Sequence, residues 1–362
     1  MANIYEKIPG CILGQFSKLK FVNGSNFKKF KDYFLANYIS GFIVPAETFD
    51  NVKGKFPIGF TIWNTSEKSK IDIIATDVFD KNGNFKGIKI FHGDLPNNIN
   101  RWIKLFDDKT QKGIAFMGNP SPDFQHNSQL YLSLNKGIEH FNFYNFTQNK
   151  LRQGCIYFSI RNCIEATWLN DRDQFLYPND HWQTDEEFQN DCFAYSLFNG
   201  QNRISCNEEI NHWIPFTEQE VNAKEKFASN FMTNFINGKL TVEQSKDLFA
   251  ETTQLGFKTL TGLEFSIEAK AVFDAGRELW SYYHSQNFPS DRGVPEGRGV
   301  YNVNASLYDI REYFQGRNDK GRMNSRSTDE KYTTLISELR KTLNILADQI
   351  KPKIYEYEFL KE

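Results

Sequence analysis

The stretch ISGFIVPAETFDNVKGKFPIGFTIWNT, from Ile39 to Thr65, decides the fold of the first part of the chain. Its two apolar runs, residues 41–46 and 57–63, are rich in Phe, Ile and Val, which favour buried strands. The polar segment between them, with Asp50, Asn51 and Gly54, is typical of a loop. Before the first run, Ser25 is a candidate N-cap for a helix over residues 25–38, in which aromatic side chains recur at helical spacing. We therefore expect a helix, a strand, a loop and a second strand, an order that forms one end of an α/β sheet.

These residues resemble the closing part of the catalytic domain in adenine-N6 DNA methyltransferases of restriction–modification systems. In that family a helix leads into a strand and then into a loop that carries Ile, Pro and Phe, here Ile43-Val44-Pro45-Ala46-Glu47-Thr48-Phe49. A second strand follows and is entered through an aromatic–Pro pair, here Phe56-Pro57. Residues 166–174 (ATWLNDRDQ) and 211–218 (NHWIPFTE) also resemble the C-terminal half of large methylases. The resemblance thus extends over most of the chain.

The catalytic motif of that family is missing from this sequence. Its tetrapeptide, Asn/Asp-Pro-Pro followed by Tyr or Phe, does not occur, and Asn119-Pro120-Ser121-Pro122 lacks both the second adjacent Pro and the aromatic residue. Gly297-Arg298-Gly299 has no strand before it, so it does not predict a cofactor-binding loop. The resemblance therefore implies the second half of a methyltransferase, which binds no cofactor alone. S-adenosylmethionine would be bound by another chain or segment that carries the catalytic loop.

Composition sets limits on the class of protein. A length of 362 residues predicts two or three domains, and a net charge of −2 with a pI near 6.4 gives no overall attraction to nucleic acid. DNA binding would therefore need a local basic face. Five cysteines without a C-x-x-C pair argue against a disulfide framework and a zinc ribbon. Neither a signal peptide nor an apolar run of membrane-spanning length is visible, so we expect a cytoplasmic protein with no membrane partner.

The sequence changes character after residue 69. Residues 71–78 and 85–91 alternate around Lys81-Asn82-Gly83-Asn84, which predicts a hairpin. Shorter strands are expected over residues 113–118, 129–134 and 141–146, and a short helix over residues 98–106. We therefore divide this half into residues 1–69, the C-terminal part of a methyltransferase-like α/β domain, and residues 70–146, a β-rich region.

Residues 147–362 are expected to form a mostly helical target-recognition region. Thr184 is a candidate cap for residues 185–198, and the pair Thr217 and Glu220 forms a capping box that predicts a helix over residues 217–236. Ser327 or Thr328 would cap a last long helix that Pro352 ends. Further helices are predicted over residues 155–168, 241–252, 264–284 and 307–314. The predicted fold class is α+β: the tail of a Rossmann-like methyltransferase α/β sheet, a β-rich middle and a mostly helical C-terminal half.

Phe56 is the first candidate site residue. In the family that the sequence resembles, the aromatic residue before this Pro lies against the flipped target adenine, and a stacking surface offsets the cost of base extrusion. Alternatively, Phe56 is a core aromatic residue beside Phe60 and Trp63.

A basic segment near the C-terminus is the second candidate, a DNA-binding loop. Its cations stand among Gly, Asn and Ser residues, a pattern that suits contacts to DNA phosphates, although most charged loops are simply solvated. They are Arg311, Arg317, Lys320, Arg322 and Arg326.

Two other clusters suggest chemistry less strongly. Residues 170–174 (NDRDQ) hold two carboxylates that are suited to a metal or to acid–base work, but such a cluster is more often an ion-pair and capping network. A zinc site would have to combine His181 and His212 with Cys192 or Cys206 at no recognised spacing.

The sequence therefore predicts the DNA-facing, target-recognition half of an adenine-N6 DNA methyltransferase, with double-stranded DNA and a chain or segment that binds S-adenosylmethionine as partners. The alternative is a non-catalytic DNA- or protein-interaction module derived from such an enzyme. An enzyme of unrelated chemistry at residues 170–174 is a third possibility.

Overall fold

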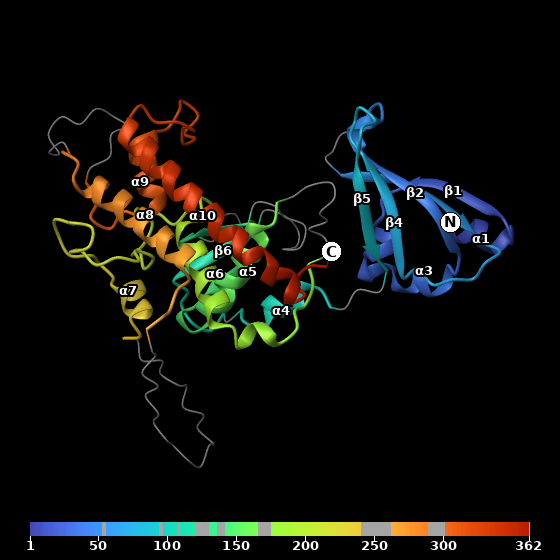
Figure 1. Cartoon of the computed structure of the whole chain (residues 1–362), viewed down its shortest axis with the longest axis horizontal. Helices are drawn as coiled ribbons and strands as arrows, with labels where there is room; N and C mark the ends of the chain where they lie inside the picture. Colours follow the sequence, from blue (N-terminus) through green and yellow to red (C-terminus); the bar gives the residue numbers. More distant parts are fainter. Residues whose placement is uncertain are drawn as a thin grey trace, which may run out of the picture. The chain divides into compact units, whose positions relative to one another are not determined.

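The computed structural model describes residues 1–52, 56–93, 97–107, 109–119, 130–135, 142–165, 175–239, 262–288 and 301–361 (Figure 1). The chain divides into two compact units, each described here by itself. The first comprises residues 1–101, 165–177 and 358–362, and the second comprises residues 102–164 and 178–357. The fold is α+β, with a mixed five-stranded sheet at the N-terminus, a small antiparallel sheet and a largely helical C-terminal half.

The first unit is built on five strands: β1 (Ile12–Ser17), β2 (Asn37–Pro45), β3 (Pro57–Asn64), β4 (Ile73–Phe79) and β5 (Phe85–His92). Their order in the sheet is β1-β3-β2-β4-β5. β2 and β4 pair in parallel, and the other neighbours are antiparallel. The hairpin predicted at residues 81–84 is confirmed, and Gly83 takes the positive φ of 81° that this turn requires.

One face of this sheet forms the core of the first unit. Because side chains alternate between faces along a strand, Leu13, Ile43, Trp63 and Val78 all point to the same side. They pack against apolar side chains of two short helices, α2 (Lys20–Asn23) and α3 (Lys28–Tyr33), and of the residues that flank these helices. A third helix, α1 (Ala2–Lys7), carries Tyr5, whose ring lies 5.1 Å from that of Phe34.

The predicted helix over residues 25–38 is largely wrong. Only Lys28–Tyr33 is α-helical, after a single 3₁₀ turn at Ser25–Phe27, and no side chain caps it. Tyr38 belongs to β2 instead: its ring contacts that of Trp63 at 5.2 Å and its hydroxyl donates to the Ala75 carbonyl at 2.8 Å. Pairing with β3 and burial against Trp63 outweigh the helical spacing of the aromatic residues.

The second unit combines a small sheet with a group of packed helices. The sheet has the order β7-β6-β8 and is antiparallel, with β6 (Ala115–Asn119), β7 (Tyr131–Ser133) and β8 (Asn142–Phe146). In Figure 1 the long helix α10 runs beside α8, and α5 packs on α6. No helix among the described residues is long and apolar enough to cross a membrane. The helices are α5 (Leu151–Cys163), α6 (Glu186–Phe198), α7 (Phe231–Ile236), α8 (Ile267–His284), α9 (Leu307–Gln315) and α10 (Glu330–Glu356), while α4 (Ile99–Lys104) lies where the two units meet in sequence.

The helix predicted over residues 217–236 is reduced to α7. The capping-box hydrogen bonds do form, since Thr217 N donates to Glu220 Oε2 at 2.7 Å and Glu220 N donates to Thr217 Oγ1 at 3.3 Å. The chain then turns at Asn222, whose φ of +54° is incompatible with a right-handed helix. The helix predicted over residues 241–252 lies outside the described residues.

The predicted limits of the last helix are also wrong. Asp329 caps α10, accepting from Tyr332 N at 2.8 Å, in place of Ser327 or Thr328. The helix continues through Pro352 to Glu356. A proline removes one backbone hydrogen bond, but Ile350 and Ile354 on either side of it are fully buried, and their packing holds the last turns in place.

Candidate nucleic-acid interface

Phe56 stands at the entrance to β3. Its carbonyl accepts a hydrogen bond from Ala46 N at 2.9 Å, and Pro57 lies opposite Pro45 in the β2–β3 ladder. The half-buried ring is faced by the Lys18 ammonium, 4.0 Å from the ring centroid. Such a cation–π contact stabilises by about 0.5–1 kcal/mol at an exposed site. The Phe56 side chain thus lies at the surface of the first unit, and the long, flexible side chain of Lys18 covers one face of its ring.

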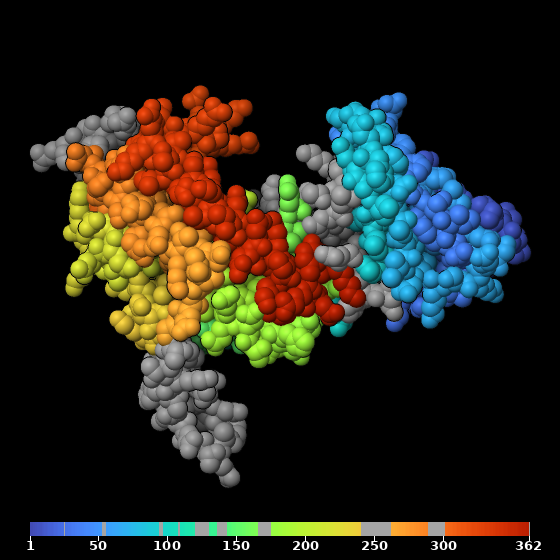
Figure 2. All heavy atoms as spheres, viewed as in Figure 1, coloured from blue at the N-terminus to red at the C-terminus, as the bar shows by residue number. Residues whose placement is uncertain are grey.

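The basic segment after α9 forms an ordered loop. It folds back on itself as a small hairpin in which Asn318 N donates to the Arg322 carbonyl and Asn324 N donates to the Gly316 carbonyl, both at 2.9 Å. Gly316 and Gly321 take positive φ values of 65° and 70°, which allow the two bends. The loop lies at the surface of the second unit, coloured orange-red in Figure 2.

Two of the five predicted DNA-binding cations have structural partners. Arg317 forms a bidentate ion pair with Glu312, at 2.6 Å from Nε to Oε1 and 2.7 Å from Nη2 to Oε2, and donates through Nη1 to the Gly321 carbonyl. The bonds to Glu312 raise the pKa of Arg317, and the bond to the Gly321 carbonyl closes the loop. Arg311 is half-buried on α9 and donates to the Gly200 carbonyl at 3.0 Å, and burial lowers its pKa.

The other three cations are free to meet an external anion. Lys320, Arg322 and Arg326 are exposed, and no carboxylate of the described residues lies within ion-pair distance of them. The structure therefore divides the segment into two arginines that hold it and three side chains that are available for phosphate contacts.

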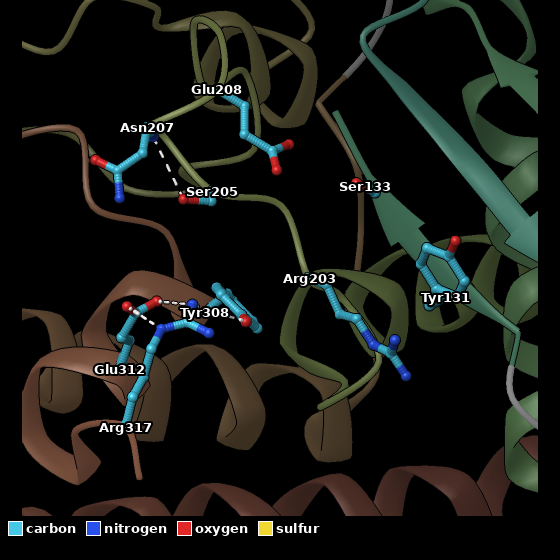
Figure 3. Close-up of a pocket in the computed structure, with 9 residues that line it drawn as sticks. All are labelled: Tyr131, Ser133, Arg203, Ser205, Asn207, Glu208, Tyr308, Glu312 and Arg317. Atoms are coloured by element: carbon cyan, nitrogen blue, oxygen red, sulfur yellow. Dashed lines mark hydrogen bonds and ion pairs between the residues drawn. The ribbon is translucent and has the colours of Figure 1, made fainter. Parts of the chain in front are cut away.

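A pocket of about 360 Å³ lies beside this loop (Figure 3). Residues from β7, from the chain around Arg203 and from α9 line it, and Arg317 is among them. The full lining is Tyr131, Ser133, Arg203, Ser205, Asn207, Glu208, Tyr308, Glu312 and Arg317.

Arg203 and Tyr131 are the pair in this pocket best suited to nucleic acid. The Leu132 carbonyl accepts from Arg203 N at 2.9 Å, and Leu132 N donates to the Gln201 carbonyl at 3.0 Å, so the two segments lie edge to edge. The guanidinium carbon of Arg203 is then 4.6 Å from the Tyr131 ring centroid. Its Nη2 also donates to Gln201 Oε1 at 2.7 Å. An exposed guanidinium placed over a ring in this way can bind a phosphate and offer a surface for base stacking.

The charges around the pocket are not all of one sign. The carboxylate of Glu312 is paired with Arg317. Glu208 also lines the pocket, and its carboxylate forms no ion pair with the residues that the structure describes. Burial is the main cause of the lowered pKa of Arg311, and the nearby positive charges of Arg340 and Arg203 lower it as well. The three cations therefore lie close enough to repel one another. The pocket therefore presents cations and carboxylates together rather than a uniformly positive surface.

No motif or charge cluster in the sequence marks Arg203. It is a lone arginine in the string Gln201 to Ser205, and its partner Tyr131 lies in a strand far away along the chain. Only the pairing of β7 with the turn after α6 brings the two together.

The remaining candidates supply no catalytic centre among the described residues. Residues 170–174 lie outside them. No group of three or more His, Cys, Asp or Glu side chains in the described part of the chain could hold a metal ion. Of the residues considered for zinc, Cys192 is fully buried within α6, while His212 shares a hydrogen bond of 2.7 Å with the Ser229 hydroxyl.

No protein-family model matches this chain, and no curated protein or solved structure matches it either.

Proposed function

We propose that this chain is the DNA-facing, target-recognition half of an adenine-N6 DNA methyltransferase of restriction–modification type. It is inactive alone and works in the cytoplasm with a chain or segment that binds S-adenosylmethionine and carries the catalytic loop. One observation carries the proposal: α3, β2, the turn after Pro45 and β3 follow one another in the order that the resemblance implies, and β3 begins at the Phe56-Pro57 pair. In this interpretation the five-stranded sheet includes the tail of a Rossmann-like methyltransferase sheet.

The free cations supply the contact with double-stranded DNA. Lys320, Arg322 and Arg326 are exposed on a loop whose shape is fixed by its own hydrogen bonds. Such side chains position a protein on phosphates without reading sequence, which fits a chain whose net charge of −2 gives no general affinity for DNA. The Arg203–Tyr131 pair adds a stacking surface on the same unit.

Phe56 is the residue that the proposal places against the extruded adenine. Its ring is at the surface, and Lys18 covers one aromatic face. A lysine side chain has enough rotamer freedom to give way to a base, so stacking would exchange one partner of the ring for another.

The test is methyl transfer from tritiated S-adenosylmethionine to mixed-sequence DNA, with this chain and the product of the upstream reading frame combined. Phe56→Ala should abolish transfer while far-UV circular dichroism stays unchanged, and Phe56→Trp should restore it because it keeps the aromatic face. Lys18→Ala is the matched control, since it removes the partner of the ring but leaves the ring. Unchanged turnover with Phe56→Ala would reject the stacking role.

A detached binding module is the second candidate. The Lys18–Phe56 contact favours it, because that contact gives the aromatic ring a purely structural partner. In that case the upstream product would carry no catalytic loop, and neither chain nor mixture would transfer a methyl group.

A further inference from the structure

The turn that follows α6 holds two arginine side chains. Arg311 on α9 donates through Nη1 to the Gly200 carbonyl at 3.0 Å, and a Cβ added at Gly200 would lie 3.6 Å from the same nitrogen. Three residues later, Arg203 donates through Nη2 to Gln201 Oε1 at 2.7 Å, and Figure 3 shows its guanidinium pointing toward Tyr131. Two guanidinium groups are therefore tethered to one short turn.

A third arginine, Arg340, reaches the same region from α10. Arg311 and Gln315 are one turn apart on α9, and Gln315 Oε1 accepts from the Tyr332 hydroxyl of α10 at 2.8 Å. Arg340 lies two turns after Tyr332 on that helix and is exposed. Burial lowers the pKa of Arg311, and the positive charges of Arg340 and Arg203 lower it as well. Cations from three separate segments thus lie within electrostatic reach of one another.

These three cations lack a compensating charge among the residues that the structure describes. None of them forms an ion pair there, although Glu312 neutralises the neighbouring Arg317, and the unpaired Glu208 of the pocket is not within ion-pair distance of any of them. Arg311 Nη2 has no hydrogen-bond partner in the described part of the chain, and its Nε is buried without one. Like charges held together in a partly buried place destabilise it, and an anion among them would remove that cost.

The chemistry of the three side chains favours a phosphate group as this anion. A guanidinium offers pairs of N–H donors in one plane, which match two oxygens of a phosphate or a carboxylate. A carboxylate has only two oxygens to share, whereas a phosphate presents more and can be divided among several arginines. Arg203 also lines the pocket of about 360 Å³, which leaves room beside the cations for the molecule that carries the phosphate.

We propose that Arg203, Arg311 and Arg340 together bind a phosphate group. Under the proposed function this phosphate belongs to the DNA backbone, and only that choice of source rests on the proposed function. The site is distinct from the three free cations of the basic loop, and it gives the helical unit a second phosphate contact at arginines whose positions are already fixed. A free nucleotide carries the same chemical group, so the experiments separate the two sources.

The first experiment observes the guanidinium groups of the intact chain by heteronuclear NMR of the arginine Nε–H signals. The Arg311 Nε–H is shielded from solvent, so its signal should persist at neutral pH, and its absence from Arg311→Lys assigns it. Titration with inorganic phosphate should shift this signal to saturation. The double variant Arg203→Gln with Arg340→Gln should weaken that binding by about tenfold, which is about 1.4 kcal/mol.

The matched control removes two exposed cations from elsewhere in the helical unit, as Lys239→Gln with Lys270→Gln. It should leave the phosphate titration unchanged, and far-UV circular dichroism checks that every variant is folded. An Arg311 signal that phosphate does not shift would overturn the site, and so would equal phosphate affinity in the two double variants.

The second experiment identifies the source of the phosphate. Fluorescence anisotropy measures binding of a DNA duplex without terminal phosphates, and deoxynucleoside monophosphates are added as competitors. Duplex binding that falls about tenfold in the arginine pair but not in the lysine pair would assign the site to the DNA backbone. Monophosphates that shift the Arg311 signal, with duplex binding equal in both pairs, would keep the phosphate site and assign it to a free nucleotide.

Methyl transfer by this chain with the product of the upstream reading frame tests the proposed function separately. Methyl transfer together with an Arg311 signal that no phosphate probe shifts would reject the site and keep the proposed function. Phosphate binding that depends on the arginines, without methyl transfer in any preparation, would do the reverse.

Discussion

Both units of the molecule are rich in aromatic rings, but they place them differently. In the helical unit, Phe198, Phe216 and Trp280 contact one another at 5.6–6.1 Å and are almost completely buried. In the sheet unit, Trp63 is equally buried on one face, whereas Phe16 and Phe85 on the other face are more than half exposed. The helical unit thus buries this ring cluster and presents cations, whereas the sheet unit leaves the rings of one face exposed.

The largest expected effect contrasts the two faces of the sheet. Trp63 is fully buried against the rings of Phe21, Phe34 and Tyr38, so Trp63→Ala should lower the free energy of unfolding of the sheet unit by about 3–5 kcal/mol. Phe85→Ala, on the open face, should cost less than about 1 kcal/mol. Urea unfolding measures both. Equal losses of unfolding free energy in the two variants would mean that the side chains on both faces of the sheet are buried in a core.

The next effect concerns DNA. Replacing Lys320, Arg322 and Arg326 with Ala should weaken binding about equally on all sequences and reduce the slope of log affinity against log salt by up to about 3, because each phosphate contact contributes about 0.9. Fluorescence anisotropy on duplex DNA at several salt concentrations measures the slope. Lys28, Lys29 and Lys68 are exposed cations of the sheet unit, and their replacement with Ala makes the same change in net charge. If the two triple variants change the salt slope equally, the effect reflects net charge alone, and the basic loop is not a specific DNA contact.

A smaller effect depends on pH and tests the helical unit alone. Burial raises the pKa of Asp191 to about 6, although its carboxylate accepts from Ser266 N and Oγ at the start of α8. Since the folded state holds this proton more tightly than the unfolded state, the contribution of Asp191 to stability is greatest below pH 4 and is lost as pH rises through 6. Asp191→Asn should remove that loss and stabilise the unit by about 1–2 kcal/mol above pH 6.5, after allowance for solvent screening.

Thermal unfolding of wild type and Asp191→Asn between pH 4.5 and 7.5 checks this sign. The two proteins should converge at the acidic end and separate at neutral pH. A wild-type Tm that rises over this range relative to the variant would contradict the assignment.

The smallest effect separates Arg317 from its neighbours. Arg317→Gln removes the exposed ion pair with Glu312 and the bond to the Gly321 carbonyl, which should cost about 0.5 kcal/mol and speed cleavage of the loop by proteinase K. Lys320→Gln, in the same loop, should leave the cleavage rate unchanged. Equal rates for the two variants would show that Arg317 does not close the loop.

The sequence predicted the strands better than the helices, for a physical reason. The runs around residues 41–46 and 57–63 are both apolar and bounded by turn residues, and the structure forms β2 and β3 there. The helix predicted up to Tyr38 failed because its aromatic spacing also suits a strand packed on Trp63, and burial decides between the two. Pro352 misled for a similar reason, since the packing of Ile350 and Ile354 carries α10 past it.

The candidate interface was predictable as a segment but not residue by residue. Composition marks residues 311–326 as basic, yet it cannot separate Arg317, which Glu312 holds, from Arg322, which stays free. Strand pairing brings Arg203 next to Tyr131, and it also places the rings of Phe16 and Phe85 on one face of the sheet. Residue types alone do not specify which strands pair.

The most direct test of the central claim is tritiated methyl transfer to mixed-sequence DNA by this chain alone, by the product of the upstream reading frame alone, and by the two together. We predict counts in DNA only from the mixture, with loss of those counts when Phe56→Ala replaces the wild-type chain. Transfer by this chain alone would contradict its assignment as the non-catalytic half, and silence in all three preparations would contradict the methyltransferase assignment itself.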